Sequence, residues 1–305
     1  MSKYLFIINP VSGKGKGRKL QNKIQEYLNS NRIIHNIILT ERPNHATEIV
    51  TALENQYKYI ISVGGDGTLN EVINGCSLNN GTIFGVLPIG SGNDFALNLG
   101  FRKNLISNLE IICSDNASIR ECDICQLEYF DKSVQKNVVK RFINNLGLGF
   151  DAQVAFINQH KKIFSGIISY VFAVLRALLK YRPINFVLKL KNDEIKGEKL
   201  LLTFGNGVSS GGGFYLTPHA KIDDNSIALT TIDFISRFKL LRKLPLALIN
   251  KLETVKEASM YKTSNADVSV NGEIYIHTDG ESAYINTDRI IVNVLDKKIK
   301  FITAE

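Results

Sequence analysis

A glycine-rich turn with a single carboxylate is the most chemically informative segment of the sequence. It follows the apolar run 59–63, which predicts a buried strand, and it precedes the predicted start of a helix. Glycines let the backbone approach a ligand closely, and the N–H groups at a helix N-terminus suit a phosphate. Asp66 is the one anion in the turn, so it either accepts hydrogen bonds from the turn or faces phosphates across a cation. We predict a nucleotide bound with a divalent ion, in contact with Gly64, Gly65, Asp66, Gly67, Thr68 and Asn70.

Two further strand-like runs, 4–8 and 82–88, also end in turns rich in Gly, Ser and Asn. In an open α/β sheet such turns share one edge, where ligands bind. The three turns therefore predict one nucleotide site rather than three unrelated loops. The first loop does not end in Gly-Lys-Ser/Thr, which excludes a P-loop. The two turns add as nucleotide contacts Asn9, Pro10, Ser12 and Gly13, and Gly90, Ser91, Gly92 and Asn93.

The pair Asn93-Asp94 also has a purely structural interpretation. Asn and Asp are preferred at the N-terminus of a helix whatever the function of the protein. We expect them to cap the helix that follows, with or without a nucleotide contact.

The elements that would position these turns alternate along the first part of the chain. Parallel strands joined by helices, with right-handed crossovers, produce such an alternation. The predicted strands lie near 4–8, 33–39, 58–63 and 83–87, and the predicted helices near 17–29, 45–54, 68–76 and 103–113.

From about residue 120 onward, strand-like runs dominate the sequence. Many short strands with polar turns predict a β-sandwich or a barrel-like sheet, so the fold class is α/β followed by mainly β. The predicted strands are 119–129, 138–147, 184–191, 198–205, 227–233, 266–271, 274–277, 283–286 and 289–295, and helices interrupt them near 151–180 and 236–250.

Composition limits the class of partner. A chain of 305 residues is natural for two domains, and its net charge of +8 favours anionic partners. We expect no nucleic acid, because the sequence has no dense basic tract and no zinc-finger or helix-turn-helix spacing. Cys122 and Cys125 lack a second pair or a nearby histidine that would complete a metal site, so we interpret the cysteines as reduced in a cytoplasmic protein. We expect no signal peptide, because the first three residues lead directly into a strand-like run.

Two helical segments are candidates for contact with a membrane surface. The longest apolar stretch, 163–179, is shorter than the roughly 20 residues of a spanning helix and contains Arg176, which favours a core or groove helix. Segment 236–244 is basic and amphipathic, as are helices that lie on anionic membranes, although Lys and Arg stems also cover apolar surface on ordinary surface helices. The sequence leaves open whether the protein contacts the inner face of the membrane and whether two copies form a homodimer.

The three turns together resemble the signature of the diacylglycerol kinase catalytic family, which includes bacterial diacylglycerol kinases, related lipid kinases and sphingosine kinases. The second half continues the resemblance in the same order, through the small-residue segment 205–213, the acidic loop 218–224 and Asp279-Gly280-Glu281. Two departures are small: Ser91 stands where the family usually has Thr, and Asn225 where it mostly has Gly.

The resemblance implies an arrangement of domains. It indicates an N-terminal three-layer parallel-sheet nucleotide domain, 1–120, and a second β-sandwich-like lipid-substrate domain, 121–295, with the active site in the cleft between them. The tail 296–305 is expected to return to the first domain.

The resemblance also implies roles for acidic residues. Asp279 and Glu281 flank a glycine, so they would share one face of a strand or lie close together across a turn. In isolation such a tripeptide is more often a solvated turn, but the resemblance makes Glu281 the first candidate for the catalytic base, with Asp279 and Asp66 as further catalytic residues. It suggests that Asp224 holds a structural Mg²⁺ with the carbonyls of Lys221 and Ser226, where an ordinary hairpin turn is the alternative. It makes Thr40 a nucleotide contact.

The resulting hypothesis is an ATP-dependent lipid kinase that uses Mg²⁺ and acts at a membrane surface on a lipid substrate, with diacylglycerol as the favoured acceptor. One alternative is a kinase of another small acceptor, similar to NAD kinase, since those relatives also use Gly-Gly-Asp-Gly. The other is a nucleotide-gated lipid-binding protein without turnover.

Overall fold

The computed structural model describes residues 3–160, 167–179, 182–191 and 193–304. The chain divides into two compact units, Met1–Cys122 together with Lys297–Glu305, and Asp123–Asp296. Part of the apolar stretch considered above, residues 163–166, lies outside the described residues.

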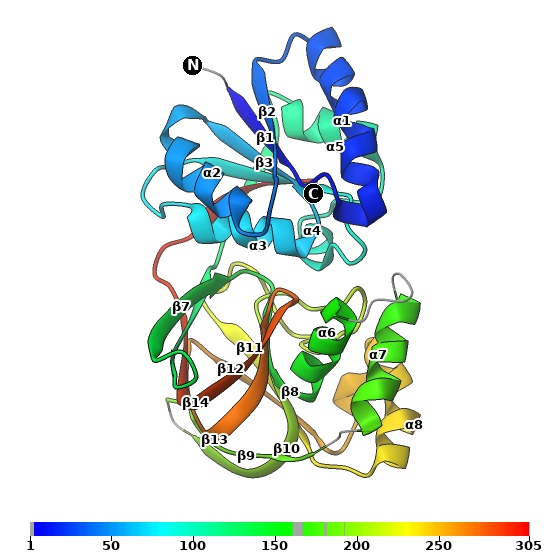
Figure 1. Ribbon diagram of the computed structural model, residues 1–305, viewed down its shortest axis with the longest axis vertical. Coiled ribbons are helices and arrows are strands. Elements are labelled where there is room, and N and C mark those ends of the chain that lie inside the picture. The colour runs from blue at the N-terminus through cyan, green and yellow to red at the C-terminus, as the bar shows by residue number, and fades with distance from the viewer. Residues whose placement is uncertain (1–2, 161–166, 180–181, 192, 305) are drawn as a thin grey trace. The chain divides into compact units, whose positions relative to one another are not determined.

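The first unit is a six-stranded sheet with α1 and α5 on one face and α2 and α3 on the other (Figure 1). Its strand order is β2-β1-β3-β4-β15-β5; the first five strands are parallel, and β5 is antiparallel to β15. The strands are β1 (Tyr4–Ile8), β2 (His35–Leu39), β3 (Tyr59–Gly64), β4 (Ile83–Pro88), β5 (Ser118–Cys122) and β15 (Ile299–Thr303). The helices are α1 (Ser12–Ser30), α2 (His45–Leu53), α3 (Asp66–Gly75), α4 (Asp94–Asn98) and α5 (Leu105–Cys113).

The strand order of this sheet creates a place for a ligand. Strand β1, all five residues of which are buried, pairs with β2 on one side and β3 on the other. The connection after β1 therefore runs toward one edge of the sheet, and the connection after β3 runs toward the other edge. Ligands of open α/β sheets bind at such a switch point, beyond the carboxyl ends of the strands.

Within the residues that the structure describes, the second unit is a nine-stranded sheet with three α-helices. Its strands are β6 (Cys125–Asp131), β7 (Lys136–Phe142), β8 (Asn145–Gly149), β9 (Ile184–Lys189), β10 (Glu194–Gly205), β11 (Ile227–Asp233), β12 (Ala258–Thr263), β13 (Asn265–Thr278) and β14 (Glu281–Val294). Its helices are α6 (Phe150–His160), α7 (Ile167–Leu179) and α8 (Arg237–Leu248).

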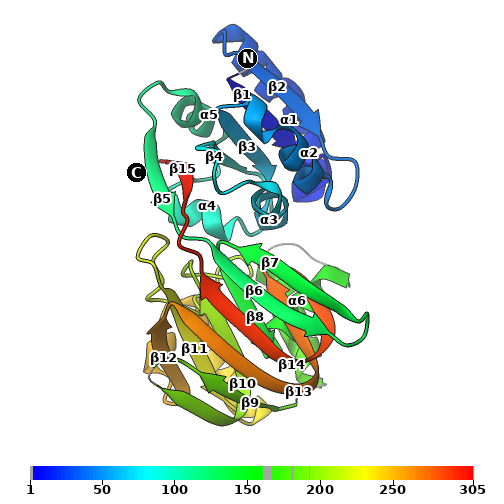
Figure 2. The ribbon, with the colours of Figure 1, turned by 90° about the vertical axis from the view of Figure 1, so that its left-hand side faces the viewer.

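This sheet curls on itself. Strand β10 pairs with both β8 and β9, and these two strands both pair with β13, which closes a ring of four strands (Figure 2). Leu148, Phe204 and Ile276 are buried in the core that the curled sheet encloses. The predicted fold class, a parallel α/β domain followed by a β-sandwich-like domain, is confirmed.

Two predicted strands are divided in the structure. The run 119–129 becomes β5 in the first sheet and β6 in the second, and between them the N–H of buried Asp123 donates to Ile222 O at 2.6 Å. The run 138–147 becomes β7 and β8, because the intervening backbone N–H groups of Ile143 and Asn144 donate to a side chain instead of a strand.

Two predicted strands form a single strand in the structure, and one strand of the structure was not predicted. The runs 266–271 and 274–277 form the single strand β13, whose pairing with β14 shifts register between Ser269 and Gly272. Strand β12 was not predicted from the sequence, although it pairs with β11 along its whole length. Among the described residues, no helix has the length and apolarity to cross a membrane.

Candidate functional site

The three glycine turns of the first unit contact one another. Asn9, directly after β1, donates from Nδ2 to Thr68 Oγ1 at 3.1 Å, which joins the first turn to the second. Gly13 has a φ of 59°, and a Cβ at this position would lie 2.2 Å from the carbonyl oxygen of Ile89, so the first turn also packs against the third. A Cβ on Gly90 would lie 2.5 Å from Gly65 Cα. The sequence thus brings three backbone segments together as closely as glycine allows.

Asp66 joins the second turn to the third. Its carboxylate accepts a hydrogen bond from Asn93 N at 2.8 Å and another from Phe95 N at 3.2 Å. Burial raises the pKa of this carboxyl, while the backbone N–H groups of Phe95, Asp94 and Asn93 act in the opposite direction. Of the two situations that the sequence left open for Asp66, the structure shows the one in which it accepts hydrogen bonds from the turns.

The start of α4 differs from the expected cap. Asn93 is the N-cap residue with a φ of 64°, but its side chain makes no capping bond and instead donates to Gly90 O at 3.0 Å. The prediction that Asn93 and Asp94 cap their own helix is therefore wrong for Asn93. Asp66, 27 residues earlier, supplies the acceptor for the first N–H groups of the helix.

The remaining nucleotide-contact candidates lie on the same elements. Thr40 follows β2, is buried, and donates from its backbone N to Ile8 O at 2.9 Å, which places it beside the end of β1. Asn70 is buried in α3 and accepts a hydrogen bond from Asn74. The other candidates lie in or next to the three turns, with Ser91 exposed and the rest buried or half-buried: Pro10, Ser12, Gly64, Gly67 and Gly92.

In the second unit, Asp279 and Gly280 form the tip of the hairpin between β13 and β14. Thr278 and Glu281 are paired across it, and the two turn residues have φ values of 49° and 87°. Positive φ at both positions matches the twist of a two-residue hairpin, for which Asp-Gly is a preferred sequence. The two acids therefore do not share one face of a strand.

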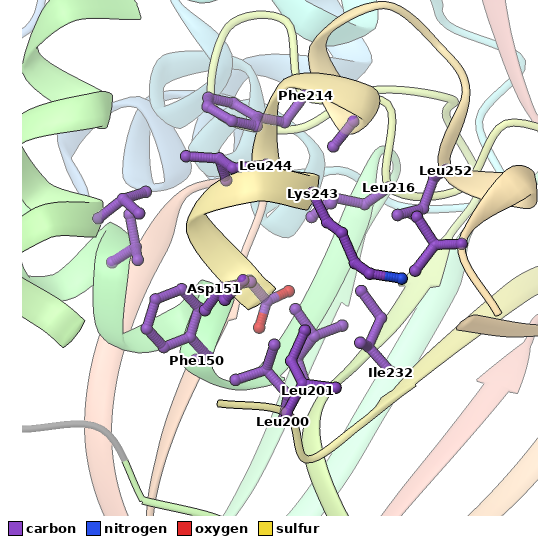
Figure 3. Close-up of a pocket in the computed structure, with 16 residues that line it drawn as sticks. Phe150, Asp151, Leu200, Leu201, Phe214, Leu216, Ile232, Lys243, Leu244 and Leu252 are labelled. Carbon is purple, nitrogen blue, oxygen red and sulfur yellow. The ribbon is translucent and has the colours of Figure 1, made fainter. Parts of the chain in front are cut away.

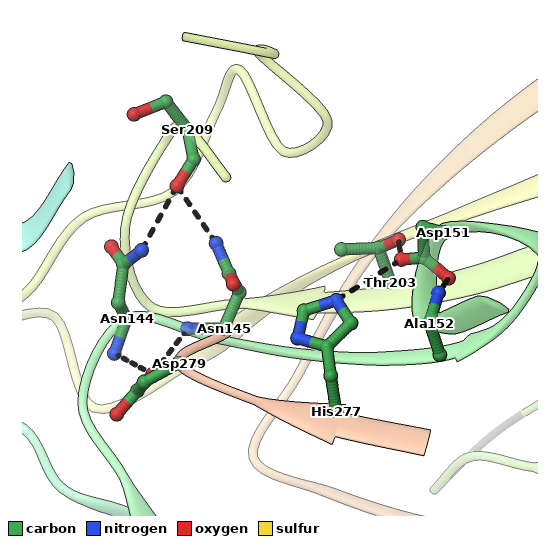
Figure 4. A network of polar contacts seen from close by, with 8 residues as sticks. All are labelled: Asn144, Asn145, Asp151, Ala152, Thr203, Ser209, His277 and Asp279. Carbon is green, nitrogen blue, oxygen red and sulfur yellow. Dashed lines mark hydrogen bonds and ion pairs between the residues drawn. The ribbon is translucent and has the colours of Figure 1, made fainter. Parts of the chain in front are cut away.

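Asp279 points inward. Its Oδ1 accepts hydrogen bonds from Asn144 N and Asn145 N, both at 2.9 Å (Figure 4). Its Oδ2 accepts one from Ile143 N at 3.1 Å. The side chain is buried, and the backbone N of Asp279 donates to Asn145 O at 2.8 Å. This carboxylate therefore fixes the hairpin tip to the start of β8.

Glu281 is exposed, in contrast to Asp279. Its Oε2 accepts a hydrogen bond from Gln159 Nε2 of α6 at 3.3 Å, and Gln159 also accepts hydrogen bonds from Ser282. An exposed carboxylate on a hairpin that is anchored by its neighbour is accessible to a reacting group. The structure thus gives the two candidate acids different surroundings.

A carboxylate from a distant part of the sequence lies against the acidic turn. Asp224 Oδ1 accepts a hydrogen bond from Ser226 Oγ at 2.5 Å, and its Oδ2 lies 2.8 Å from Lys262 Nζ. Asp123, 102 residues from the turn in sequence, accepts a hydrogen bond from Asn225 N at 2.7 Å. Two carboxylates with nearby backbone oxygens are a donor set of the kind that Mg²⁺ binds, although Lys262 already neutralises one of them.

No group of three or more His, Cys, Asp or Glu side chains within the described part of the chain is arranged to hold a metal ion. Any ion at the acidic turn would rely on backbone oxygens as well, as the candidates Lys221 and Ser226 imply.

The ion pair at this turn predicts a dependence of stability on pH. Burial raises the pKa of Asp224, but the hydrogen bonds from Lys262 and Ser226 outweigh it, so its pKa lies below 3.8. The ionised carboxylate therefore stabilises the folded state above that pH, and this contribution is lost as the pH falls through the lowered pKa. Lys262→Gln should cost about 0.2–1 kcal/mol at neutral pH, because the pair is partly exposed. The difference in melting temperature from wild type should shrink below about pH 4.

Lys262→Arg, which keeps the charge, is the control for this measurement and should follow wild type. A Lys262→Gln difference that stays constant from neutral to acidic pH would show that the ion pair contributes nothing.

A second polar cluster lies deeper in the same unit. Asp151 accepts hydrogen bonds from Thr203 Oγ1 at 2.6 Å and from Ala152 N at 2.8 Å (Figure 4). His277 Nε2 lies 3.6 Å from the same carboxylate, and both side chains are almost completely buried. These contacts hold Asp151 at the start of α6.

Asp151 also lies in the wall of an apolar pocket. The pocket is enclosed by α6, α7, α8, β10 and β11, and Asp151 and Lys243 are the polar members of a lining that is otherwise aliphatic and aromatic (Figure 3). Phe150, Leu200 and Leu244 are typical of that lining. Such a lining suits an apolar group and offers very few polar partners.

The comparisons with known proteins agree with this geometry. Residues 3–127 match the family profile of the diacylglycerol kinase catalytic domain, and residues 144–293 match that of the YegS C-terminal NAD kinase beta sandwich-like domain. The diacylglycerol kinase of Staphylococcus haemolyticus is 28% identical over 281 residues, which cover 90% of this chain and 81% of that protein. A crystal structure of a diacylglycerol kinase from Bacillus anthracis aligns with a TM-score of 0.74 over 99% of this chain and 97% of that one, at 19% identity, and so shows the same fold.

One relative is similar enough to settle the family. The Enterobacter protein named "Probable lipid kinase YegS-like" is 30% identical over 230 residues, which cover 74% of this chain and 72% of that protein. Two family profiles in the expected order, a matching fold and three joined glycine turns agree with this similarity. The chain belongs to the diacylglycerol kinase family of lipid kinases.

Proposed function

We propose that this protein transfers the γ-phosphate of ATP to the hydroxyl of a lipid, and that diacylglycerol is the acceptor, which would give phosphatidic acid. The observation that carries the proposal is the joining of three glycine turns at the switch point of a parallel sheet. Backbone N–H groups in such turns, and at the N-terminus of α3, suit the phosphates of ATP.

The lipid part of the proposal is supported by the apolar pocket of the second unit. An acyl chain requires an apolar lining, and all but two of the side chains in this pocket are aliphatic or aromatic. NAD, the acceptor in the rival interpretation, is polar and charged along its length. The pocket therefore favours a lipid over a dinucleotide.

In the proposed reaction the lipid hydroxyl oxygen attacks the γ-phosphorus, the bond from that phosphorus to the bridging oxygen breaks, and ADP leaves with the bridging oxygen. Glu281 accepts the proton of the hydroxyl, and Asp279 keeps the hairpin that carries Glu281 in position. Asn9 and Thr68 orient the turns that hold the phosphates.

Mg²⁺ belongs to the proposal as the charge partner of the nucleotide phosphates and as a structural ion. When bound, it would neutralise the negative charge of the phosphates. At the acidic turn, Asp224 with the carbonyls of Lys221 and Ser226 would hold it, and Asp123 is a further carboxylate in contact with that turn. An ion there would take over from Lys262 as the partner of Asp224.

The product formed from γ-labelled ATP tests the proposed function. We expect the label in an organic-extractable product when the protein is supplied with a total lipid extract, and mass spectrometry of that product identifies the acceptor. A water-soluble labelled product would instead indicate a kinase of NAD or another small acceptor. Binding of nucleotide without any labelled product would indicate a lipid-binding protein without turnover, and either result would overturn the proposal.

A further inference from the structure

Helix α8 has two apolar faces, although its packing explains only one. Leu240, Leu244 and Ala247 line the apolar pocket and pack in the core of the second unit. Away from that packed side, Phe238 is 83% exposed and Leu241 is 39% exposed, and Ile249, which caps the C-terminus of the helix, is 57% exposed. A helix packed against a domain needs one apolar stripe, so the second stripe is not accounted for by the fold.

Exposed cations accompany this outer stripe. Arg237, Lys239 and Arg242 are all exposed on α8. Lys243 differs from them, because it lines the pocket and its Nζ lies 2.5 Å from Glu257 Oε2. The outer face of α8, consisting of Phe238, Leu241 and Ile249 with these three exposed cations, therefore combines apolar side chains with positive charge. That combination is typical of helices that lie in the interface of an anionic membrane.

Helix α7 of the same unit also presents apolar side chains to solvent. It lies beside α8 (Figure 1), and the inner residues of both helices belong to one core cluster. Its outward residues Ile168, Leu175 and Leu179 are 64%, 47% and 75% exposed. Arg176 stacks over Phe172, with 4.6 Å between the guanidinium carbon and the ring centroid. Two neighbouring helices thus each present apolar side chains to solvent.

We propose that the outer face of α8, extended by the exposed residues of α7, docks on the surface of an anionic lipid bilayer. The cations would bind the lipid headgroups, and Phe238 and Leu241 would enter the boundary between headgroups and acyl chains. The purpose of this docking rests on the proposed lipid substrate, because the inner side of the same helix lines the apolar pocket. Docking would place that pocket next to the source of the acceptor.

Co-sedimentation with vesicles tests the docking. We expect the protein to bind vesicles made of equal parts phosphatidylglycerol and phosphatidylcholine, to bind pure phosphatidylcholine far more weakly, and to be released by high salt. Replacing Arg237, Lys239 and Arg242 by Gln should lower the affinity for the anionic vesicles about 100-fold. Phe238→Ser combined with Leu241→Ser should lower it at least about tenfold.

Matched controls come from the exposed sheet surface of the same unit. Replacing the exposed cations Lys136, Lys140 and Lys189 by Gln changes the net charge equally, and Val139→Ser removes an apolar side chain that is 58% exposed. Neither control should change vesicle binding by more than about threefold. Equal losses in the charge variant and its control would show that only net charge matters and would overturn the proposal.

Two further measurements separate membrane docking from a loss of catalysis and from dimer formation. With lipid dispersed in detergent micelles, the α8 variants should phosphorylate it at the wild-type rate, so a lack of activity there argues against the proposed function and not against docking. If Phe238→Ser with Leu241→Ser converts a dimer into a monomer and leaves vesicle binding unchanged, the face is an interface between copies of this chain and the proposal fails.

Discussion

Asp66→Asn is expected to lower turnover at least about 100-fold, because a misplacement of about 1 Å in the groups that orient a substrate has an effect of this size. The carboxylate of Asp66 accepts hydrogen bonds from Asn93 N and Phe95 N, so it sets the position of the third glycine turn relative to the second. An amide has one acceptor oxygen and would direct its NH₂ group at one of these two N–H donors. The third turn should then move away from the geometry that holds the phosphates.

The effect of Asp66→Asn on stability should be much smaller than its effect on turnover. Burial raises the pKa of Asp66, so replacing the carboxylate by a neutral amide removes a desolvation cost. The N–H group that loses its acceptor costs about 1–3 kcal/mol, which offsets that gain. Asp66→Ala leaves both N–H groups without the carboxylate, and its melting temperature should be several degrees lower than that of Asp66→Asn.

Thermal unfolding and steady-state kinetics of the two variants check this, with Asp115→Asn as a control. Asp115 is an exposed carboxylate of the same unit that pairs with Lys3 at 3.0 Å, so its loss should change neither property. Wild-type turnover in Asp66→Asn would remove Asp66 from the machinery of the site.

The sequence identified the glycine turns because their signal is local. An apolar strand followed by Gly, Ser and Asn is visible within about ten residues, and parallel strands necessarily bring such turns to one edge. The hairpin tip Asp279-Gly280 also has a local signal, since Asp-Gly between alternating strands is characteristic of a two-residue turn. This Asp-Gly turn alone predicts that Asp279 lies at the tip of the hairpin and Glu281 on the strand after it, so that the two acids have different surroundings.

The roles of the acidic residues could not be predicted in the same way. Asp66, Asp279 and Asp123 all accept hydrogen bonds from backbone N–H groups, and every residue except proline has one. Their partners lie 27, 135 and 102 residues away in the sequence. No residue type marks such a partner, so the sequence shows which residues are acidic but not which of them the fold uses as anchors.

The same limit applies to the divided strands. The run 119–129 looks like one strand because Asp123 is one of several polar residues in it, and none of them marks a break. Only the hydrogen bond from Asp123 N to Ile222 O, between residues far apart in sequence, shows that the chain leaves one sheet there and enters another.

The second large effect is expected at the hairpin between β13 and β14, where two substitutions should separate anchoring from proton transfer. Glu281→Gln keeps the shape of an exposed side chain and its contact with Gln159, so the free energy of unfolding should change by less than about 0.5 kcal/mol. It removes the proton acceptor, and turnover should fall about 10²–10⁴-fold while ATP affinity is retained. Wild-type turnover in this variant would exclude Glu281 as the base and shift that assignment to Asp279.

Asp279→Asn, in contrast, should lower the stability of the fold, and it should affect turnover only through the position of Glu281. Asparagine tolerates the φ of 49° at this position, so the backbone is not strained by the change. However, its NH₂ group would face one of the three N–H donors from Ile143, Asn144 and Asn145, at a cost of about 1–3 kcal/mol. We expect a lower melting temperature and impaired turnover, because the hairpin tip that positions Glu281 is no longer held to β8.

The double variant decides whether Asp279 acts through Glu281. If the buried acid only positions the exposed one, its loss matters little once Glu281 is gone, and the turnover of the double variant should be close to that of the poorer single variant. The measurement is kcat for the wild type, the two single variants and the double variant at saturating ATP, below the melting temperature of the least stable protein. Multiplication of the two single defects would show that Asp279 and Glu281 contribute independently. In that case the hydrogen bonds from β8 stabilise the hairpin without serving the proton acceptor.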